Sequence, residues 1–237
     1  MRALHLYLVM VLWSIVSCTK AADDPQPVVM PPAGPTAPAS TISFLSLGDS
    51  YTIGEGAGAT ERWSVQLAQL AKSEGLATPD IIARTGWTTA DLQAAIRSAN
   101  NSKTYDLVSL LIGVNNQFRG QPVATYRMEF RQLLETAVQF AAGRPGRVVV
   151  LSIPDWGRSP FGQGYDQARV SQQINQFNAV AQEECRQLGI AFVDITEITR
   201  SASDDNTQFT PDRLHYSGKH MQQWATQALP VVRTLLK

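Results

Sequence analysis

Short apolar runs that alternate with longer amphipathic segments constrain the fold of this chain more than any other feature. The apolar runs from residue 41 onward are 42–47, 80–83, 107–112, 147–153 and 191–193. The run 107–112 (LVSLLI) is nearly continuous, which is typical of a parallel strand buried on both faces. Strand–helix alternation of this kind predicts an α/β fold, in which helices cover both faces of a five-stranded parallel sheet.

The segments between these runs repeat apolar residues at helical spacing. They predict helices over 63–74, 89–99, 125–142, 166–188 and 219–237, with Thr88 or Thr89 capping the second and a bend allowed at Pro230. In a parallel sheet the active site lies at the carboxyl ends of the strands, near the point where the strand order reverses. The loops expected at that edge are 48–62, 84–88, 113–122, 154–164 and 195–216.

Residues 1–17 predict an export signal. Arg2 supplies a positive start, and the apolar stretch 6–16 (LYLVMVLWSIV) is too short to span a bilayer stably. Cys18 follows after a single small residue, Ser17, as in a bacterial lipoprotein box, and we interpret it as a lipidation site that attaches the protein to a membrane. An ordinary secretory signal with an incidental cysteine is the alternative. Thr19 stands where an inner-membrane retention signal would often place Asp. For a Gram-negative source this favours the outer membrane, facing the periplasm or the cell surface.

Residues 18–40 predict a tether between the membrane and a folded domain at 41–237. Six prolines, at 25, 27, 31, 32, 35 and 38, disfavour a helix or a packed core in this segment. If Cys18 is acylated, Cys185 has no disulfide partner, and we expect it to be a small buried apolar side chain.

The charge balance and the histidines exclude some functions. Lys plus Arg (20) equals Asp plus Glu (20), so no global field attracts polyanions, and nucleic acid is not an expected partner. The sequence has no His/Cys cluster at metal-ligand spacing, so neither a metal nor a cofactor is expected.

Candidate catalytic groups follow the first strand and precede the last helix. Ser50 lies in a glycine-flanked turn (Gly48-Asp49-Ser50) that can expose its hydroxyl, but a hydroxyl needs a neighbouring base to act as a nucleophile. His215 is the candidate base, and Asp212 three residues earlier can reach its ring to fix the tautomer. A surface loop that ends at a Ser217 helix cap would explain Ser217, but not the Asp and His.

Two further loops offer donors for the negative charge that develops during acyl transfer. Gly86 can bring a backbone N–H close to a substrate because it lacks a Cβ, although for this glycine taken by itself a simple turn is the more ordinary interpretation. Asn115 can offer a side-chain amide. His220 falls inside the final helix, where a structural or solvent-exposed role is expected.

These residues occur as Gly48-Asp49-Ser50, Gly86, Gly113-x-Asn115 and Asp212-x-x-His215, in this order within 41–237. The set resembles the four sequence blocks of the SGNH (GDSL) hydrolases. The resemblance implies a flavodoxin-like three-layer α/β/α sandwich and a Ser50–His215–Asp212 triad. It also implies an oxyanion hole formed by the backbone N–H groups of Ser50 and Gly86 and the side chain of Asn115.

The sequence departs from the family pattern at two positions. Asn116 stands where the third block usually has Asp, so the local hydrogen bonding is expected to differ. Tyr51 follows the nucleophile where the family name implies Leu. No Gly-x-Ser-x-Gly motif surrounds Ser50, which argues against the α/β-hydrolase fold.

The substrate is predicted only by class. We expect hydrolysis of carboxylic esters or thioesters through an acyl-Ser50 intermediate, with short-chain esters or O-acetylated glycans as substrates. A catalytically inactive envelope binding protein with the same fold is the alternative. The aromatic residues Trp87, Phe118, Trp156 and Phe161 fall in the site loops, where they can line an acyl pocket, stack on a sugar ring or cover the core. The loop 154–164 is the expected specificity element.

Overall fold

The computed structural model describes residues 41–202 and 205–237. The predicted signal peptide, Cys18 and the proline-rich tether lie outside the described residues. A five-stranded sheet forms the centre, with strand order β2-β1-β3-β4-β5 and parallel pairing throughout. Its strands are β1 (Phe44–Gly48), β2 (Asp80–Ala83), β3 (Leu107–Leu111), β4 (Val148–Leu151) and β5 (Ala191–Val193).

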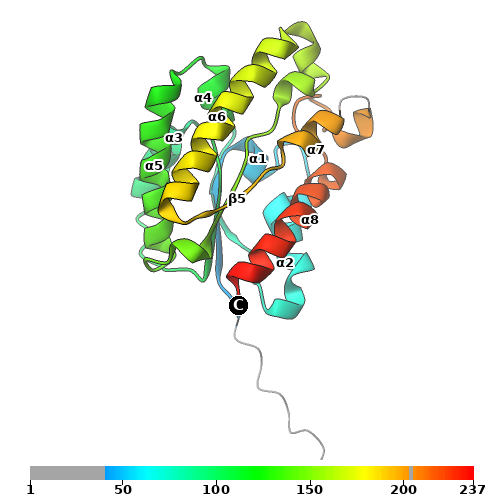
Figure 1. Ribbon diagram of the computed structural model, residues 1–237. Coiled ribbons are helices and arrows are strands. Elements are labelled where there is room, and N and C mark those ends of the chain that lie inside the picture. Colours follow the sequence, from blue (N-terminus) through cyan, green and yellow to red (C-terminus); the bar gives the residue numbers. More distant parts are fainter. Residues whose placement is uncertain (1–40, 203–204) are drawn as a thin grey trace, which may run out of the picture. The chain divides into compact units, whose positions relative to one another are not determined.

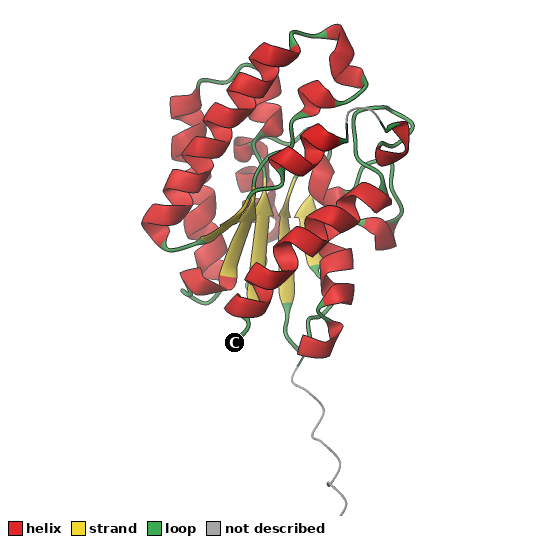
Figure 2. Cartoon of the chain, turned by 45° about the vertical axis from the view of Figure 1, so that its right-hand side comes forward, coloured by secondary structure: helices red, strands yellow, loops and turns green. Residues whose placement is uncertain are grey.

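Helices cover both faces of this sheet (Figures 1 and 2). On one side lie α3 (Thr89–Ala99), α5 (Val123–Phe140) and α6 (Gln167–Leu188), and on the other lie α2 (Trp63–Leu70) and α8 (Gly218–Leu235). The layers and the strand order confirm the predicted three-layer, flavodoxin-like α/β/α sandwich. The strand order reverses between β1 and β3, and that is where a ligand site is expected in such a sheet.

The core explains why the central strands read as apolar runs. Every residue of β1, β3 and β4 is buried, because helices pack on both faces. Trp63 of α2 and Trp224 of α8 are completely buried where these two helices pack together. Cys185 is also fully buried and unpaired, as predicted, and burial raises the pKa of its thiol to about 12.

Three strands end together at the edge of the sheet that carries the candidate site. Gly48 at the end of β1 pairs with Ala83 of β2 and with Leu111 of β3. A Cβ on Gly48 would lie 2.4 Å from the Leu111 carbonyl oxygen, so only glycine permits this close approach. The loops after β1, β2 and β3 therefore leave the sheet side by side.

The structure adds short helices that the sequence patterns did not predict. These are α1 (Ser50–Ile53), α4 (Val114–Phe118) and α7 (Thr196–Ser201), and the 3₁₀ turns η1 (Ala59–Glu61), η2 (Lys72–Glu74), η3 (Pro145–Arg147), η4 (Trp156–Arg158), η5 (Phe161–Gly164) and η6 (Asn206–Gln208). They are too short to show a helical period in sequence. The predicted helix 63–74 is wrong at its end, because α2 stops at Leu70 and the 3₁₀ turn η2 follows.

The remaining helix boundaries follow their caps. Thr88 caps α3 by accepting a hydrogen bond from the Asp91 N–H, as predicted. Ser217 occupies the N-cap position of α8, but its hydroxyl donates to the Thr207 carbonyl instead of capping the helix. The α8 helix runs unbroken through Pro230. Within residues 41–202 and 205–237 no helix combines the length and apolar character needed to cross a membrane.

Candidate active site

Ser50 is the first residue of α1, immediately after β1. Asp49 is the N-cap of this helix, and its Oδ1 accepts the Tyr51 N–H at 3.0 Å. Gly54 ends the helix in the left-handed conformation, with φ of 69°. This tight turn holds Ser50 at the floor of a pocket, with only 3% of the residue exposed.

His215 and Asp212 form the pair that the Asp-x-x-His spacing predicts. Asp212 Oδ2 lies 2.6 Å from His215 Nδ1. Asp212 Oδ1 accepts the backbone N–H groups of Leu214 and His215, both at 2.9 Å, and the Thr210 hydroxyl at 2.8 Å. The carboxylate therefore organises the turn and also orients the imidazole, which leaves His215 Nε2 as the nitrogen available to a reacting group.

Electrostatics keep Asp212 ionised. Partial burial by itself would raise its pKa, but the hydrogen bonds from the His215 ring, the His215 and Leu214 backbone and Thr210 outweigh burial and hold the pKa at about 2. The carboxylate therefore stays negative at neutral pH, where it can stabilise a protonated His215 ring.

Tyr51 supports the imidazole from below. Its ring centroid lies 5.3 Å from that of His215 at an interplanar angle of 55°, and it also packs on Tyr216 and Trp224. In the sequence Tyr51 is recognisable only as a departure from the family pattern, because a contact between residues 51 and 215 has no local signal. A large ring that packs on His215 explains why an aromatic residue is compatible with this position.

Gly86 and Asn115 lie at the predicted edge of the sheet. Gly86 has φ of 83°, a left-handed conformation that residues with a Cβ disfavour. The backbone turn therefore requires glycine here, whether or not the Gly86 N–H also binds a ligand. Asn115 Nδ2 donates one hydrogen bond to the Trp87 carbonyl at 3.0 Å. An amide has two N–H donors, so the Trp87 carbonyl orients this group and leaves one donor for a ligand.

The neighbouring Asn116 is buried and faces away from this pocket. Its Oδ1 accepts the Thr89 N–H at 3.1 Å, and its Nδ2 donates to Thr89 Oγ1 at 2.6 Å and to Gln121 Oε1. A carboxylate could accept the first bond but could not donate the other two. The asparagine therefore fits its surroundings, and it ties the start of α4 to the start of α3.

A pocket of about 150 Å³ brings the predicted residues together. Ser50, Gly86, Asn115 and His215 all line it, and Asp212 lies behind His215. The other lining residues, which the sequence analysis did not single out for this pocket, are Tyr51, Thr85, Val114 and Leu214, together with the expected aromatics Phe118 and Trp156. Among the described residues no hydrogen bond joins Ser50 Oγ to the His215 ring; in ligand-free enzymes this bond often tightens only with substrate.

Comparison with known protein families agrees with this arrangement. The model of the GDSL-like lipase/acylhydrolase family matches residues 46–222. The chain belongs to this family of acylhydrolases. No curated protein sequence matches the chain.

Solved structures of similar fold include other members of the GDSL-like group and related esterases. An acetylxylan esterase from Geobacillus stearothermophilus superposes with a TM-score of 0.62 at 19% identity, covering 81% of this chain and 94% of that one. A lipase/acylhydrolase from Enterococcus faecalis gives a TM-score of 0.61 at 20% identity, covering 82% of this chain and 96% of that one. A psychrotrophic esterase from Pseudoalteromonas sp. gives 0.62 at 14% identity, covering 81% and 97%. At these identities the likeness shows a shared fold.

The predicted aromatic residues divide into two groups in this acylhydrolase. Trp156 is buried and Phe118 is 49% exposed, and both line the pocket. Trp87 packs against the hydrophobic core and contributes its carbonyl to Asn115, not its ring to the pocket. Phe161 is 37% exposed and packs near Trp156, with 6.2 Å between ring centroids.

Asp49 beside the nucleophile is a buried carboxyl that the sequence analysis did not recognise. It is completely buried, and its Oδ2 has no hydrogen-bond partner among the described residues. Burial raises its pKa to about 7. The carboxyl is therefore neutral over most of the acidic range, so no buried negative charge stands next to Ser50 there.

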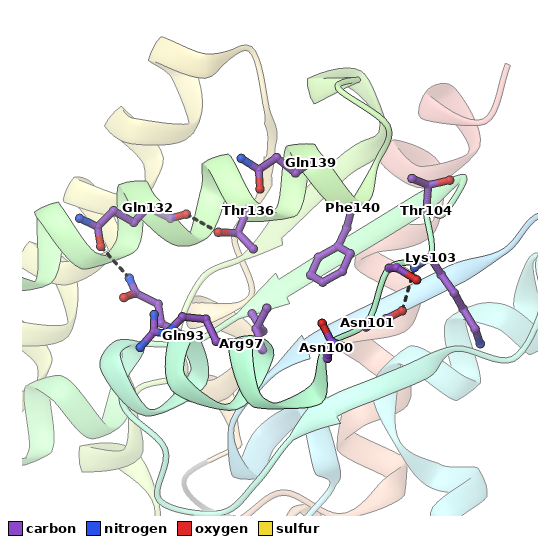
Figure 3. Close-up of a pocket in the computed structure, with 12 residues that line it drawn as sticks. Gln93, Arg97, Asn100, Asn101, Lys103, Thr104, Gln132, Thr136, Gln139 and Phe140 are labelled. Carbon is purple, nitrogen blue, oxygen red and sulfur yellow. Dashed lines mark hydrogen bonds between the residues drawn. The ribbon is translucent and has the colours of Figure 1, made fainter.

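A surface pocket larger than the one at Ser50 lies elsewhere in the acylhydrolase (Figure 3). It measures about 570 Å³, between α3, α5 and the segment that leads into β3, at the amino end of the strands. Gln93 and Gln132 point toward one another across it, joined by a hydrogen bond of 3.1 Å. It contains neither Ser50 nor His215, so size alone does not identify the active site. Within residues 41–202 and 205–237 no cluster of His, Cys, Asp and Glu could hold a metal ion.

Proposed function

We propose that this protein is a serine esterase that hydrolyses short-chain carboxylic esters through an acyl-Ser50 intermediate. The observation that carries the proposal is the convergence of Ser50 and the hydrogen-bonded pair Asp212–His215 on one small pocket. A binding protein has no need of an imidazole oriented by an ionised carboxylate beside a hydroxyl. The arrangement therefore favours turnover over the alternative of an inactive binding protein.

The proposed reaction has two halves. Ser50 Oγ attacks the ester carbonyl carbon while His215 Nε2 takes the hydroxyl proton, and the carbonyl oxygen becomes an oxyanion. The N–H groups of Ser50, Gly86 and Asn115 would stabilise that charge. The tetrahedral intermediate then expels the alcohol, which receives the proton from His215. In the second half a water molecule gives a proton to His215 and attacks the acyl carbonyl carbon. The new tetrahedral intermediate then expels Ser50, which takes that proton back, and the carboxylic acid is released.

Pocket size favours a short acyl group. Sites for drug-sized ligands usually measure about 300–1,000 Å³. The pocket at Ser50 measures about 150 Å³, which suits an acetyl or similarly short group. O-acetylated glycans are the second candidate substrates, because an acetyl ester combines a short acyl group with a bulky alcohol.

The test is hydrolysis of p-nitrophenyl esters of increasing acyl length by the full chain, with Ser50→Ala as the matched variant. We expect acetate and butyrate to be hydrolysed faster than octanoate, and we expect the variant to lose activity while keeping the wild-type melting temperature. Hydrolysis that persists in a folded Ser50→Ala variant would refute the assignment of Ser50 as the nucleophile. A wild type that hydrolyses no ester would favour the inactive binding protein.

We also propose that the esterase is a lipoprotein of the cell envelope, attached through Cys18 and held in the outer membrane. The support is the apolar stretch 6–16, which only Ser17 separates from Cys18, and the proline-rich tether that follows. In a host that processes lipoproteins, Cys18→Ala should move the protein from the membrane fraction to the soluble one. Unchanged membrane attachment of Cys18→Ala would refute an anchor at this residue.

A further inference from the structure

A second groove, here called the aromatic groove, adjoins the catalytic pocket. It measures about 320 Å³ and is lined by residues of α4, the 3₁₀ turn at Trp156 and the start of α6. Phe118 and Trp156 line both cavities, so the two share a wall. A substrate that places its acyl group at Ser50 therefore has the aromatic groove available for what lies beyond its ester bond.

In this groove two exposed aromatic rings, those of Phe118 and Tyr165, pack on the buried ring of Trp156. Trp156 is buried, and Phe118 and Tyr165 meet its ring at 71° and 86°, with centroids 5.1 and 4.9 Å away. Phe118 is 49% exposed and Tyr165 is 48% exposed. Exposed aromatic rings that gather beside a catalytic pocket are typical of a binding surface, because soluble proteins otherwise bury such area.

A chain of hydrogen bonds holds the base of the groove in place. Trp156 Nε1 donates to Gln117 Oε1 at 2.7 Å, and Gln117 Nε2 donates to Gln173 Oε1 at 2.9 Å. Gln173 lines the groove and is partly exposed, so its amide still has donors to offer. Hydrogen bonds through Gln117 therefore connect the buried Trp156 to the polar side chain of Gln173.

The lining favours a sugar over an acyl chain. Besides the rings it contains Asp166, Arg169 and Gln173, and Val170 is its aliphatic side chain. A fatty acyl chain needs a continuous aliphatic channel, and a charged rim would oppose it. A pyranose ring instead presents C–H groups on its faces, which pack on aromatic rings. Its hydroxyl groups point outward from the ring edge, where amide, carboxylate and guanidinium groups can bind them.

We propose that the aromatic groove is the subsite for the alcohol part of the substrate, and that it binds the pyranose ring of an O-acylated saccharide on Phe118 and Tyr165. The proposal rests on the proposed esterase function and deepens it. The acetyl group would enter the pocket at Ser50, while the sugar stacks in the groove. Phe118 and Tyr165 thereby determine the preference for one alcohol over another.

The experiment compares two acetate esters that differ in the alcohol: the triacetate of methyl β-xyloside and ethyl acetate. The quantity measured is the ratio of kcat/KM for the sugar ester to kcat/KM for ethyl acetate, from acetic acid release in a pH-stat. An aromatic contact contributes about 0.5–1.5 kcal/mol, so Tyr165→Ala should lower this ratio about threefold, and Phe118→Ala/Tyr165→Ala about tenfold. The decrease should appear mainly as a higher KM for the sugar ester.

Two control variants separate stacking from packing. Tyr165→Phe keeps the ring and should retain most of the wild-type ratio. Met128→Ala removes an exposed side chain on α5 that is 62% exposed and lines neither cavity, and it should leave the ratio unchanged. Melting temperatures of all variants establish that each one is folded.

The outcomes distinguish the subsite from the esterase function. An equal loss on both esters in Tyr165→Ala overturns the sugar subsite. A third ester, ethyl octanoate, is measured in the same way, and a loss confined to it would also overturn the sugar subsite, because the groove would then bind acyl chains. Calorimetric titration with xylotriose, which carries no ester, tests the groove without catalysis. If the protein hydrolyses no ester but binds xylotriose, and Tyr165→Ala weakens that binding, the esterase function is refuted and the sugar site is supported. No binding of xylotriose together with an unchanged ratio would refute the sugar site alone.

Discussion

His220 should make the stability of this protein depend on pH in a way that one substitution removes. The ring is 1% exposed and stacks on Tyr216, with 4.4 Å between centroids, and it meets Trp224 edge-on. Its Nδ1 lies 3.2 Å from Gln208 Oε1, and its Nε2 has no hydrogen-bond partner among the described residues. Burial lowers the pKa of His220 to about 4, because a protonated ring here would carry an unpaired charge.

The sign follows from proton linkage. An unfolded histidine titrates near pH 6.5, so between about pH 6.5 and 4 the unfolded chain binds a proton that the folded chain does not. The stability that the neutral ring contributes is therefore present above pH 6.5 and is lost as the pH falls toward 4. With these two pKa values, the change from pH 7 to pH 5 costs about 2 kcal/mol of unfolding free energy.

The perturbation is His220→Phe, which keeps an aromatic ring but cannot titrate. Loss of the Gln208 hydrogen bond lowers stability by a constant amount, roughly 1 kcal/mol, at every pH. Urea unfolding, followed by tryptophan fluorescence at pH 7, 6 and 5, gives the unfolding free energies of the wild type and of the variant. We expect the unfolding free energy of the wild type minus that of the variant to fall by about 2 kcal/mol between pH 7 and pH 5, so that the variant becomes the more stable protein at pH 5. A difference that stays constant within about 0.5 kcal/mol across this range would refute the reasoning.

The wild type alone cannot provide this test, because Asp49 acts in the opposite direction. Burial raises the pKa of Asp49 to about 7, so its neutral form stabilises the folded state at low pH. That contribution is lost as the pH rises from about 4 through 7, which overlaps the window of His220. Only the difference between wild type and variant isolates the histidine.

Two predictions concern catalysis. In Asp212→Asn, the amide Oδ1 can keep the backbone hydrogen bonds while Nδ2 donates to His215 Nδ1, which forces the ring proton onto Nε2. The ring can then no longer accept the Ser50 proton, so kcat for p-nitrophenyl acetate should fall about 10⁴-fold. A loss below about tenfold would contradict the role of the Asp212–His215 pair. In Asn115→Ala, one of the proposed oxyanion donors is lost, so kcat should fall about 10²–10³-fold with little change in KM. An effect confined to KM would assign this amide to substrate binding instead.

The fold followed from the sequence because its signals are local. Apolar runs such as 107–112 identify strands without reference to the rest of the chain. The alternation of strands and helices then leads to a parallel sheet, because each helix returns the chain to the edge of the sheet where the previous strand began. Prediction failed for α1, α4 and α7, which are shorter than the window of about 11 residues needed to recognise a helical period.

The candidate site followed from the same topology. A parallel sheet gathers the loops after its strands at one edge, so Ser50, Gly86, Asn115 and His215 could be assigned to one site before any distance was measured. The Asp212–His215 pair was also predictable, because three residues on one turn already bring the two side chains together. These inferences depend on spacing along the chain and on strand order, both of which the sequence contains.

Contacts between side chains from distant segments were decided by the tertiary structure alone. The tilted packing of Tyr51 against His215 joins residues far apart in sequence, and so does the hydrogen bond from Asn115 to the Trp87 carbonyl. The placement of Phe118 and Tyr165 around Trp156 is of the same kind. Burial also sets the pKa values of Asp49 and His220, and it depends on every element packed around them. Composition and periodicity determine which face of an element turns inward, whereas the partner it meets there depends on how all the layers pack together.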